Sequence, residues 1–456
     1  MTDITTRTAD VRAPSRAEIR LVIAASSLGT VFEWYDFFIW GTLTASGILQ
    51  RSFFPAGDEL LATLLSWATF AVGFAFRPLG AVIFGYLGDR LGRKYTFLVT
   101  ITLMGIATAG IGVMPSYAAI GAAAPLLIVL LRIAQGLALG GEYGGAAIYV
   151  AEHAPAGKAG FYTSFIQAGV VGGFILSLAI VLLTKSAVSA EAWIGVWWRF
   201  PFLFSLLLLA VSLWMRLKLS ESPVFQRMRA AGEGARNPFR ESFTYPGNIR
   251  RLLVALFGIA AGLTVIWYTA LFSVLAFLAG PKSAMKMDET SGQLIVAAGA
   301  LLGLVFYFLT GAWSDRVGRK KPIMVGYALT LLLLFPLFWL IGDAAGNGTN
   351  PAGFVPGVGA TAIIVLGILG LMALSGLTYG SVAALLAEMF PPRIRYSSLS
   401  IPYHIGTGYF GGFLPLISAA VVARTGDPYA GLWYTEAVVA MALVVTWFGL
   451  QEPPRD

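Results

Sequence analysis

Cysteine is absent from this 456-residue sequence, and charged residues are scarce. Without cysteine, the chain can form neither a disulfide nor a thiolate metal site. Asp, Glu, Lys and Arg make up 12% of the residues, whereas 57% are hydrophobic, and the mean hydropathy is +0.77. A soluble chain of this length needs far more charge to cover its surface. The composition therefore predicts a polytopic membrane protein.

Motifs for catalysis and cofactor binding are also missing. There is no Cys/His metal spacing, no P-loop and no nucleophile elbow, and the glycine runs do not follow strands as dinucleotide-binding loops would. Residues 1–20 are polar and mixed in charge, so we predict no signal peptide. We expect no enzyme activity and no cofactor. A receptor or membrane-embedded enzyme is disfavoured, because no soluble domain or catalytic constellation accompanies the apolar segments.

A ten-residue pattern occurs twice. Gly85-Tyr-Leu-Gly-Asp-Arg-Leu-Gly-Arg-Lys94 returns as Gly311-Ala-Trp-Ser-Asp-Arg-Val-Gly-Arg-Lys320, with each matching residue 226 positions later. Each copy lies between two long apolar segments. Because the offset is about half the chain, we predict two copies of one structural unit.

A membrane-spanning helix needs about 20 apolar residues, and we predict twelve such spans. They are 21–49, 60–87, 95–114, 122–150, 160–184, 199–217, 251–279, 291–313, 322–341, 360–387, 397–423 and 431–450. The polar stretch 218–250 is the predicted linker between two pseudo-symmetric six-helix bundles, 21–217 and 251–450, with tails at 1–20 and 451–456. The predicted fold is all-α and integral to the membrane.

Cation placement predicts the orientation. If both termini are cytoplasmic, the inside segments hold 23 of the 31 Lys and Arg residues and the outside segments hold 6. This asymmetry also accounts for the pI near 9.6, so we expect no nucleic-acid partner. We predict a multi-pass protein of a bacterial inner membrane, and twelve spans in two halves suffice for a monomer in the lipid bilayer.

At this point the chain resembles the major facilitator superfamily. The duplicated loop matches the family signature, and Arg132-Ile-Ala-Gln135-Gly136-Leu-Ala-Leu-Gly140 is similar to its span-4 arginine motif. Further matches resemble the metabolite:proton symporter branch, whose members carry shikimate, 2-oxoglutarate, citrate, proline or betaine, and small monocarboxylates. These matches are Gly29-Thr-Val-Phe-Glu33-Trp-Tyr-Asp36-Phe-Phe, Arg77-Pro-Leu-Gly80, Gly140-Gly-Glu142-Tyr-Gly-Gly and Glu221-Ser-Pro223. In span 11, Tyr403-His404-Ile-Gly406 and Phe410-Gly-Gly-Phe413 look most like the monocarboxylate type.

Ionisable residues deep in a span cost about 2.5–3.5 kcal/mol each on insertion scales, so each needs a reason. Five lie deep in the first half, and His404 is the only one that the sequence places deep in the second. The five are Glu33, Asp36, Arg77, Arg132 and Glu142. Asp36 and Arg132 lie at similar depth, roughly 24 Å and 28 Å from the cytoplasmic ends of their helices, and can meet. Structural ion pairs are the alternative interpretation.

The resemblance implies roles for these residues. In related sugar porters an acid in span 1 and the span-4 arginine form the proton-coupling pair, which corresponds here to Asp36 and Arg132. Glu33 and Glu142 are rival proton carriers. Arg77 is a candidate anion ligand, because a guanidinium fork matches a carboxylate; alternatively it caps carbonyls freed by Pro78. Other substrate-binding candidates are Gln135, Gln167, Tyr268, Tyr379, Tyr403 and His404, with interhelical hydrogen bonding or packing as the alternative.

The duplicated loops predict a cytoplasmic gate. By resemblance, Glu152 and Glu388 at the ends of spans 4 and 10 pair with Arg93 and Arg319. Asp89 is expected at the N-terminus of span 11, and Asp315 at that of span 5, where a helix dipole favours a carboxylate. The alternative is that the cations only enforce topology.

The sequence thus predicts a secondary active transporter that takes up a small carboxylate-bearing metabolite together with a proton. An exporter or an uncoupled facilitator of a small organic solute is the alternative.

Overall fold

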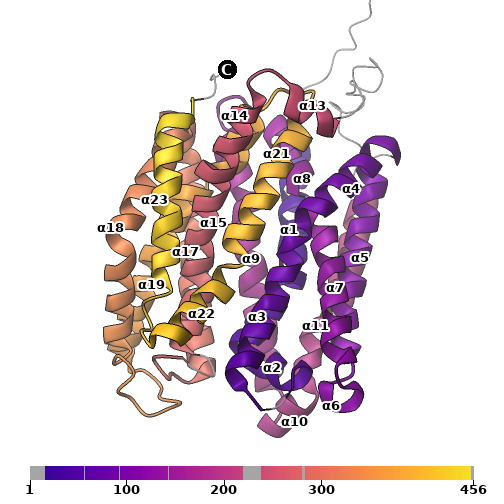
Figure 1. Cartoon of the computed structure of the whole chain (residues 1–456). Helices are drawn as coiled ribbons and strands as arrows, with labels where there is room; N and C mark the ends of the chain where they lie inside the picture. The colour runs from indigo at the N-terminus through magenta and orange to yellow at the C-terminus, as the bar shows by residue number, and fades with distance from the viewer. Residues whose placement is uncertain are drawn as a thin grey trace, which may run out of the picture.

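The computed structural model describes residues 16–55, 57–91, 93–141, 143–218, 238–279 and 283–452. The described residues are almost entirely helical, and the only β-structure among them is one isolated bridge between Met287 and Phe354. The all-α prediction is therefore confirmed. The first-half helices pack on one side of the molecule and the second-half helices on the other, with α13 and the C-terminal end of α23 at one end (Figure 1). We call that end the linker end.

The first half holds the helices that precede the linker. They are α1 (Arg16–Ala45), α2 (Ile48–Phe53), α3 (Glu59–Ala75), α4 (Arg77–Leu91), α5 (Arg93–Val113), α6 (Tyr117–Ile120), α7 (Ala123–Gly140), α8 (Tyr143–His153), α9 (Ala159–Ser186), α10 (Ala190–Gly195), a 3-10 turn at Trp197–Arg199, and α11 (Phe200–Lys218).

The second half follows the same plan. Its helices are α13 (Pro238–Thr244), α14 (Asn248–Leu253), α15 (Ala261–Tyr268), α16 (Val274–Leu278), α17 (Glu289–Val317), α18 (Lys320–Ala344), α19 (Val358–Tyr379), α20 (Val382–Met389), α21 (Arg395–Ile405), α22 (Leu414–Thr425) and α23 (Leu432–Gly449). Three π-helical segments, Val254–Ala260, Thr269–Ser273 and Gly406–Gly411, interrupt the spans built on α14–α16 and α21–α22.

The predicted spans correspond to these helices. Among the described residues, ten helices are long and apolar enough to cross a membrane. The helix α1 and the shorter apolar helix Leu98–Val113 within α5 account for the other two predicted spans. The predicted linker is partly helical, because 238–250 contains α13 and the start of α14, whereas 219–237 lies outside the described residues.

A break in the second membrane span positions Arg77, the central residue of the candidate functional site. The helix α3 ends at Ala75, and α4 begins at Arg77. Pro78 has no N–H to donate back along the helix, and its ring clashes with the preceding turn, so it interrupts the hydrogen-bond ladder there. Opposite this break, Gly408 of the π-helical segment Gly406–Gly411 and the following Gly412 lie against Phe74. A Cβ added at either glycine would crowd Phe74.

Aromatic side chains fill the space between the two halves. Phe38 of α1 stacks on Trp267 of α15, with 5.0 Å between ring centroids. Phe70 of α3 packs on Phe272 at 5.6 Å, and Phe74 packs on Tyr268 at 5.6 Å. Offset and edge-to-face pairs of this kind add to the energy of burial. The centre of the molecule is therefore a closed aromatic layer.

Glycine allows two spans of the first half to touch. A Cβ added at Gly136 of α7 would overlap the carbonyl oxygen of Gly73 in α3. We expect Gly136→Ala to destabilise the protein by about 1–3 kcal/mol, because overpacking forces the helices apart. The thermal unfolding midpoint in detergent measures this. Gly110→Ala is the matched control, because its Cβ would meet Leu131 at an ordinary 3.4 Å; equal midpoints for the two variants would contradict the prediction.

Candidate functional site

Arg77 lies fully buried at the centre of the molecule, between the two halves. Its Nη1 donates to Thr407 Oγ1 of the second half at 3.3 Å. The guanidinium carbon lies 5.1 Å from the ring of Trp34 and 5.3 Å from that of Phe74. Its Nε and Nη2 have no hydrogen-bond partner. A buried cation with unpaired donors is costly, so this guanidinium is suited to receive an anion.

A small space surrounds Arg77. Its volume is about 10 Å³, and both halves line it, with Trp34, Val170, Thr264, Trp267, Tyr268, Tyr379 and Thr407 joining Arg77. The Tyr268 hydroxyl is buried there without a hydrogen-bond partner. This space holds about one water, so a substrate enters only when the aromatic side chains separate.

A tyrosine layer closes this space on the linker-end side. Tyr143 of α8 stacks on Tyr403 of α21, with 3.8 Å between ring centroids and 3° between ring planes. Tyr403 and Tyr379 share a hydroxyl hydrogen bond of 2.7 Å, and Gln167 Nε2 donates to the Tyr143 hydroxyl at 2.5 Å. The layer joins the two halves through rings and hydroxyl groups.

His404 belongs to the same layer. Its ring lies edge-on to Tyr403 at 5.6 Å and to Tyr143 at 6.4 Å. Both ring nitrogens are buried without a hydrogen-bond partner. Six predicted substrate-binding residues therefore gather around one point, namely Arg77, Gln167, Tyr268, Tyr379, Tyr403 and His404.

Arg132 and Gln135, also predicted to bind substrate, lie within the first half and are bonded to it. Arg132 Nη1 donates to Gln135 Oε1 at 2.7 Å and to the Phe37 carbonyl at 3.4 Å, and Nη2 donates to the Phe70 carbonyl at 3.3 Å. Gln135 Nε2 donates to Thr108 Oγ1 at 2.7 Å and to the Asp36 carbonyl at 3.3 Å. In this conformation the two side chains join helices of the first half.

The expected contact between Asp36 and Arg132 is not an ion pair here. The salt bridges among the described residues do not include it, because backbone carbonyls and Gln135 take the donors of Arg132. Asp36 is 5% exposed, and its Oδ1 has no hydrogen-bond partner. Glu33 is also buried. The rival proton carrier Glu142 lies outside the described residues.

The second copy of the repeated loop joins the two halves at the linker end. Asp315 accepts hydrogen bonds from the Gly160 and Phe161 amides, at 2.7 and 2.9 Å, where α9 begins. Arg319 bonds Asp315 at 2.6 Å and Glu388 at 2.8 Å. Burial lowers the pKa of the Arg319 guanidinium, but Glu388 and Asp315 outweigh it, and that pKa is raised above its ordinary value. The geometry expected for Asp315, Arg319 and Glu388 is thus present.

The first copy is described only in part. The side chains of Asp89 and Arg93 lie outside the described residues. Glu152 bonds Arg395 of α21 at 3.2 Å, a contact between the halves that the sequence analysis did not predict. The family motif would pair Glu152 with Arg93 of the same half. Arg395 instead belongs to the second half, where span 11 begins.

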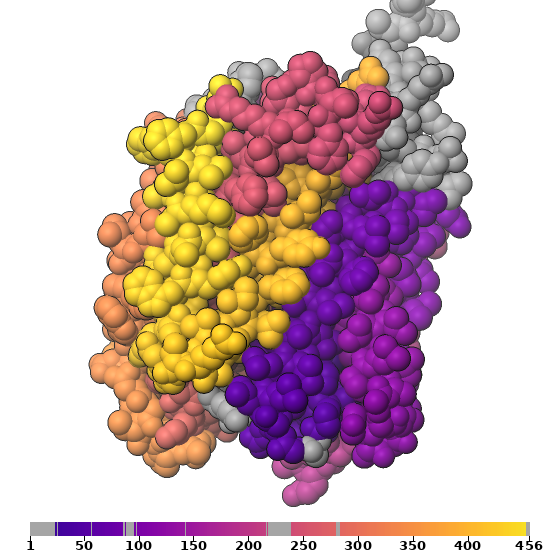
Figure 2. All heavy atoms as spheres, viewed as in Figure 1, coloured from indigo at the N-terminus to yellow at the C-terminus, as the bar shows by residue number. Residues whose placement is uncertain are grey.

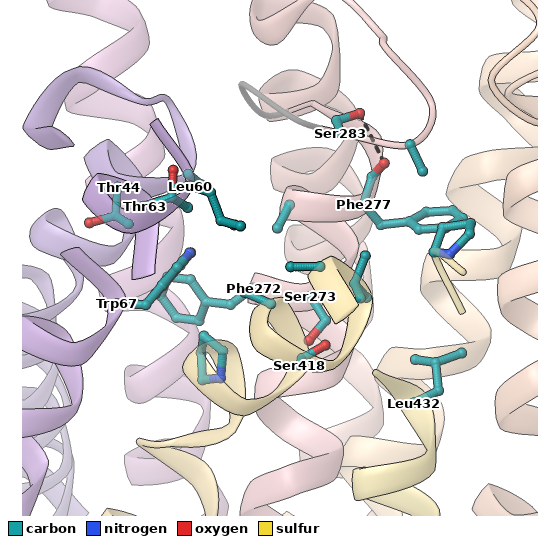
Figure 3. A pocket seen from close by; sticks show the side chains of 18 of the residues that line it. Thr44, Leu60, Thr63, Trp67, Phe272, Ser273, Phe277, Ser283, Ser418 and Leu432 are labelled. Atoms are coloured by element: carbon teal, nitrogen blue, oxygen red, sulfur yellow. Dashed lines mark hydrogen bonds between the residues drawn. The ribbon is translucent and has the colours of Figure 1, made fainter. Parts of the chain in front are cut away.

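A pocket lies at the end opposite the linker, and Figure 3 shows the side chains that line it. Its volume is about 210 Å³, and both halves line it, among them Trp67 of α3, Phe272 and Ser418 of α22. Trp67 and Phe272 lie edge-to-face at 6.4 Å. In the same region Lys185 of α9 bonds Glu289 of α17 at 3.2 Å. Among the described residues, Asp315 and the Glu152–Arg395 pair thus join the halves at the linker end, and a pocket lies between the halves at the other end.

Several residues of this arrangement were missed by sequence reasoning. Trp34 and Thr407 contact Arg77, and Tyr143 stacks in the tyrosine layer. Glu452 accepts hydrogen bonds from the amides of Arg319 and Lys320, at 2.5 and 3.1 Å, where α18 begins. The position of Trp34 next to Glu33 and that of Tyr143 next to Glu142 are the only sequence signals that could have pointed to them.

Comparison with known proteins identifies the fold and the relatives. Residues 21–252 match the family model described as sugar (and other) transporter, and residues 272–456 match that of the Major Facilitator Superfamily. The metabolite transport protein YhjE of the Escherichia coli K12 inner membrane is 35% identical over 426 residues, with 93% of this chain and 92% of that protein covered. The shikimate transporter of the same organism is 34% identical over 438 residues, at 94% and 92% coverage.

Further relatives and solved structures agree. A proline/betaine transporter of Salmonella typhimurium LT2 is 33% identical over 445 residues, with 95% of this chain and 84% of that protein covered. The structure of the proton:xylose symporter XylE bound to 6-bromo-6-deoxy-D-glucose superposes with a TM-score of 0.72 at 19% identity, covering 96% of each chain. At that identity the likeness concerns the fold.

Proposed function

The chain belongs to the major facilitator superfamily and is a membrane transporter rather than an enzyme, and we propose that it takes up a small carboxylate together with a proton. Family membership establishes that the protein is a transporter. The chemistry of the central site supports the proposal that it carries a small carboxylate and a proton. Substrate and proton would be carried by alternating access, in which the halves open first at one end and then at the other.

The observation that carries the carboxylate proposal is the guanidinium of Arg77. Its Nε and Nη2 are buried without partners between the two halves, and a guanidinium presents adjacent N–H groups that fit the two oxygens of a carboxylate. Tyr268 adds a hydroxyl without a hydrogen-bond partner. Bound carboxylate would thus connect donors from both halves, and its binding would favour the closed state.

One available arginine favours a single carboxylate. Arg132, the other arginine deep in the first half, is occupied by the carbonyls of α1 and α3 and by Gln135. The remaining walls near Arg77 are largely aromatic or apolar, including Trp34, Val170 and Trp267. These walls suit the apolar body of a monocarboxylate better than a second charged group.

A carboxyl group in the first half would carry the proton. Asp36 is buried, its Oδ1 is unpartnered, and no cation is bonded to it among the described residues. Burial without a paired cation favours the protonated form of a carboxyl group. Glu33 and Glu142 remain rival carriers.

We further propose that the linker end faces the cytoplasm, with both termini there. In this orientation the cytoplasmic segments hold 23 Lys and Arg residues and the outside segments hold 6, as the positive-inside rule expects. In this conformation the cytoplasmic gate, formed by Asp315, Arg319, Glu388, Glu152 and Arg395, is closed. The pocket of Figure 3 then lies toward the outside, on the route to Arg77.

Ligand competition tests the substrate class. Trp34 and Trp267 line the central space, so we expect binding to change tryptophan fluorescence in purified protein. Small monocarboxylates should compete with one another at least tenfold better than dicarboxylates of the same length, proline or betaine. Stronger competition by a dicarboxylate or by an uncharged solute would contradict the single-carboxylate proposal. Competition by proline or betaine alone would favour a zwitterionic substrate.

A further inference from the structure

An apolar stripe is exposed along α13 and α14 at the linker end. The stripe consists of Phe239, Phe243, Tyr245, Ile249 and Leu253, whose side chains are each 40–49% exposed. We call these residues the aromatic edge. Phe239 and Phe243 pack on each other, with 5.2 Å between ring centroids. Large apolar side chains gathered on one surface mark a place that contacts something other than water.

The aromatic edge continues the surface of a membrane span. Leu253 belongs to the helix Asn248–Leu278, which is long and apolar enough to cross a membrane. Ile249 lies one turn before Leu253 on the same helix face, and the chain from Tyr245 back to Phe239 extends the stripe beyond the span. The segment covers the front of the linker end above the second half (Figure 2). This continuity points to lipid as the occupant.

The charges beside the aromatic edge are mostly positive. Residues 238–253 contain three arginines, Arg240, Arg250 and Arg251, and one acid, Glu241. That acid is bonded to Arg393, with 2.9 Å between Oε2 and Nε. Arg250 uses Nη2 on the Gly449 carbonyl at 3.4 Å. A guanidinium binds phosphate oxygens well, and an apolar face flanked by arginine is typical of helices that lie in an anionic membrane surface.

Buried hydrogen bonds hold the segment in place. Asn248 Nδ2 donates to the Ser242 carbonyl at 2.7 Å and to Ser398 Oγ at 3.0 Å. The Ser398 and Ser242 hydroxyls bond each other at 3.0 Å. Together with Glu241–Arg393, these contacts fix α13 on the start of α21. The surface is therefore formed in advance, so little ordering is needed on binding.

We propose that the aromatic edge is an interfacial binding site for anionic phospholipid. The aromatic side chains lie at the boundary of the acyl chains, and Arg250 and Arg251 bind the phosphate of the headgroup. A second protein is the weaker occupant, because the stripe runs without interruption into the surface of a membrane span. This inference does not depend on the identity of the transported solute.

Depth measurement tests the position of the aromatic edge. The chain has no cysteine, so Phe243→Cys introduces a single site for a nitroxide spin label. In liposomes of phosphatidylglycerol and phosphatidylcholine, we expect oxygen to collide with the label at least threefold more often than a water-soluble nickel chelate does. The exposed residue Val358, at the opposite end and 89% exposed, gives the reference as Val358→Cys. Equal nickel accessibility at both positions would place the edge in water and overturn the proposal.

Lipid binding tests the role of the arginines. Phosphatidylglycerol with a photoreactive acyl chain should label residues 238–253 of the full protein, and Arg250→Gln/Arg251→Gln should reduce this labelling at least fivefold. Arg424→Gln, at an exposed arginine of the opposite end, is the control and should leave it unchanged. Equal labelling in the double variant would refute the headgroup site. Loss of wild-type labelling with millimolar inorganic phosphate would identify a free-anion site instead and would also refute it.

Discussion

Arg77→Lys is expected to weaken binding of the transported carboxylate by more than tenfold, about 1.4 kcal/mol. Lysine keeps the charge but loses the planar fork, so it cannot offer the adjacent donors that Nε and Nη2 of Arg77 leave unpaired. It also has no counterpart for the bond from Nη1 to Thr407 at the same geometry. Equilibrium binding to the purified protein measures the change.

Two control variants make the result for Arg77 interpretable. Arg424→Lys changes an exposed arginine at the opposite end and should bind substrate as the wild type does. Thr407→Val removes the hydroxyl that holds Nη1 and leaves the fork in place, so we expect a smaller loss. Unchanged affinity in Arg77→Lys, together with a lower unfolding midpoint, would show that Arg77 only supports the helix break at Pro78.

Asp315→Ala is expected to shift the protein toward the state that is open at the linker end. The Asp315 carboxylate accepts two amide hydrogen bonds at the N-terminus of α9 and binds Arg319. A hydrogen bond to a charged group is worth about 1.5–3 kcal/mol, so losing this link should change the population at least tenfold. A second charged contact between the halves among the described residues of this end, Glu152–Arg395, would remain.

Cysteine labelling reports that shift. Ser400 is 2% exposed where α21 meets Gly144 of α8, so Ser400→Cys should react with a water-soluble maleimide mainly when the halves separate at the linker end. We expect labelling at least tenfold faster in the presence of Asp315→Ala. Asp427→Ala, at an exposed turn of the opposite end, is the control. The same labelling rate for Asp315→Ala and wild type would remove Asp315 from the gate.

The spans and the contacts of the second repeated loop could be predicted because their signals are local. An apolar run of sufficient length can only be a membrane helix in lipid. The second copy of the loop carries its acid and its arginine four residues apart, so Asp315 and Arg319 meet on adjacent turns. The resemblance then supplied Glu388 and the end of α9 as partners.

The partners of Arg132 could not be predicted, because they are backbone carbonyls. Phe37 and Phe70 contribute oxygen atoms that any residue would supply at those positions, so the sequence carries no sign of them. Arg132 and Asp36 were expected at similar depth, but depth does not specify which face of a helix turns to which neighbour. The Tyr143–Tyr403 stack was hidden for the same reason, since it needs the relative rotation of α8 and α21.

The aromatic edge is another feature that could not be predicted from the sequence. The polar stretch 218–250, whose low hydropathy indicates a linker, contains Phe239, Phe243 and Tyr245. The segment that carries them is held on α21 by the hydrogen bonds of Asn248 and Ser242 to Ser398. Such contacts between distant segments appear only once the helices are placed.

Uptake driven by an imposed proton gradient tests the central proposal most directly. The purified protein would be reconstituted into liposomes with an acidic exterior, and entry of a radiolabelled small monocarboxylate would be followed with and without a protonophore. The account predicts accumulation above the external concentration, lost when the protonophore is added or when both sides have the same pH. Because the protonated acid can cross a bilayer unaided, protein-free liposomes and Arg77→Lys set the background. Entry that only equilibrates the two sides, at the same rate with and without the gradient, would show an uncoupled facilitator and contradict proton symport.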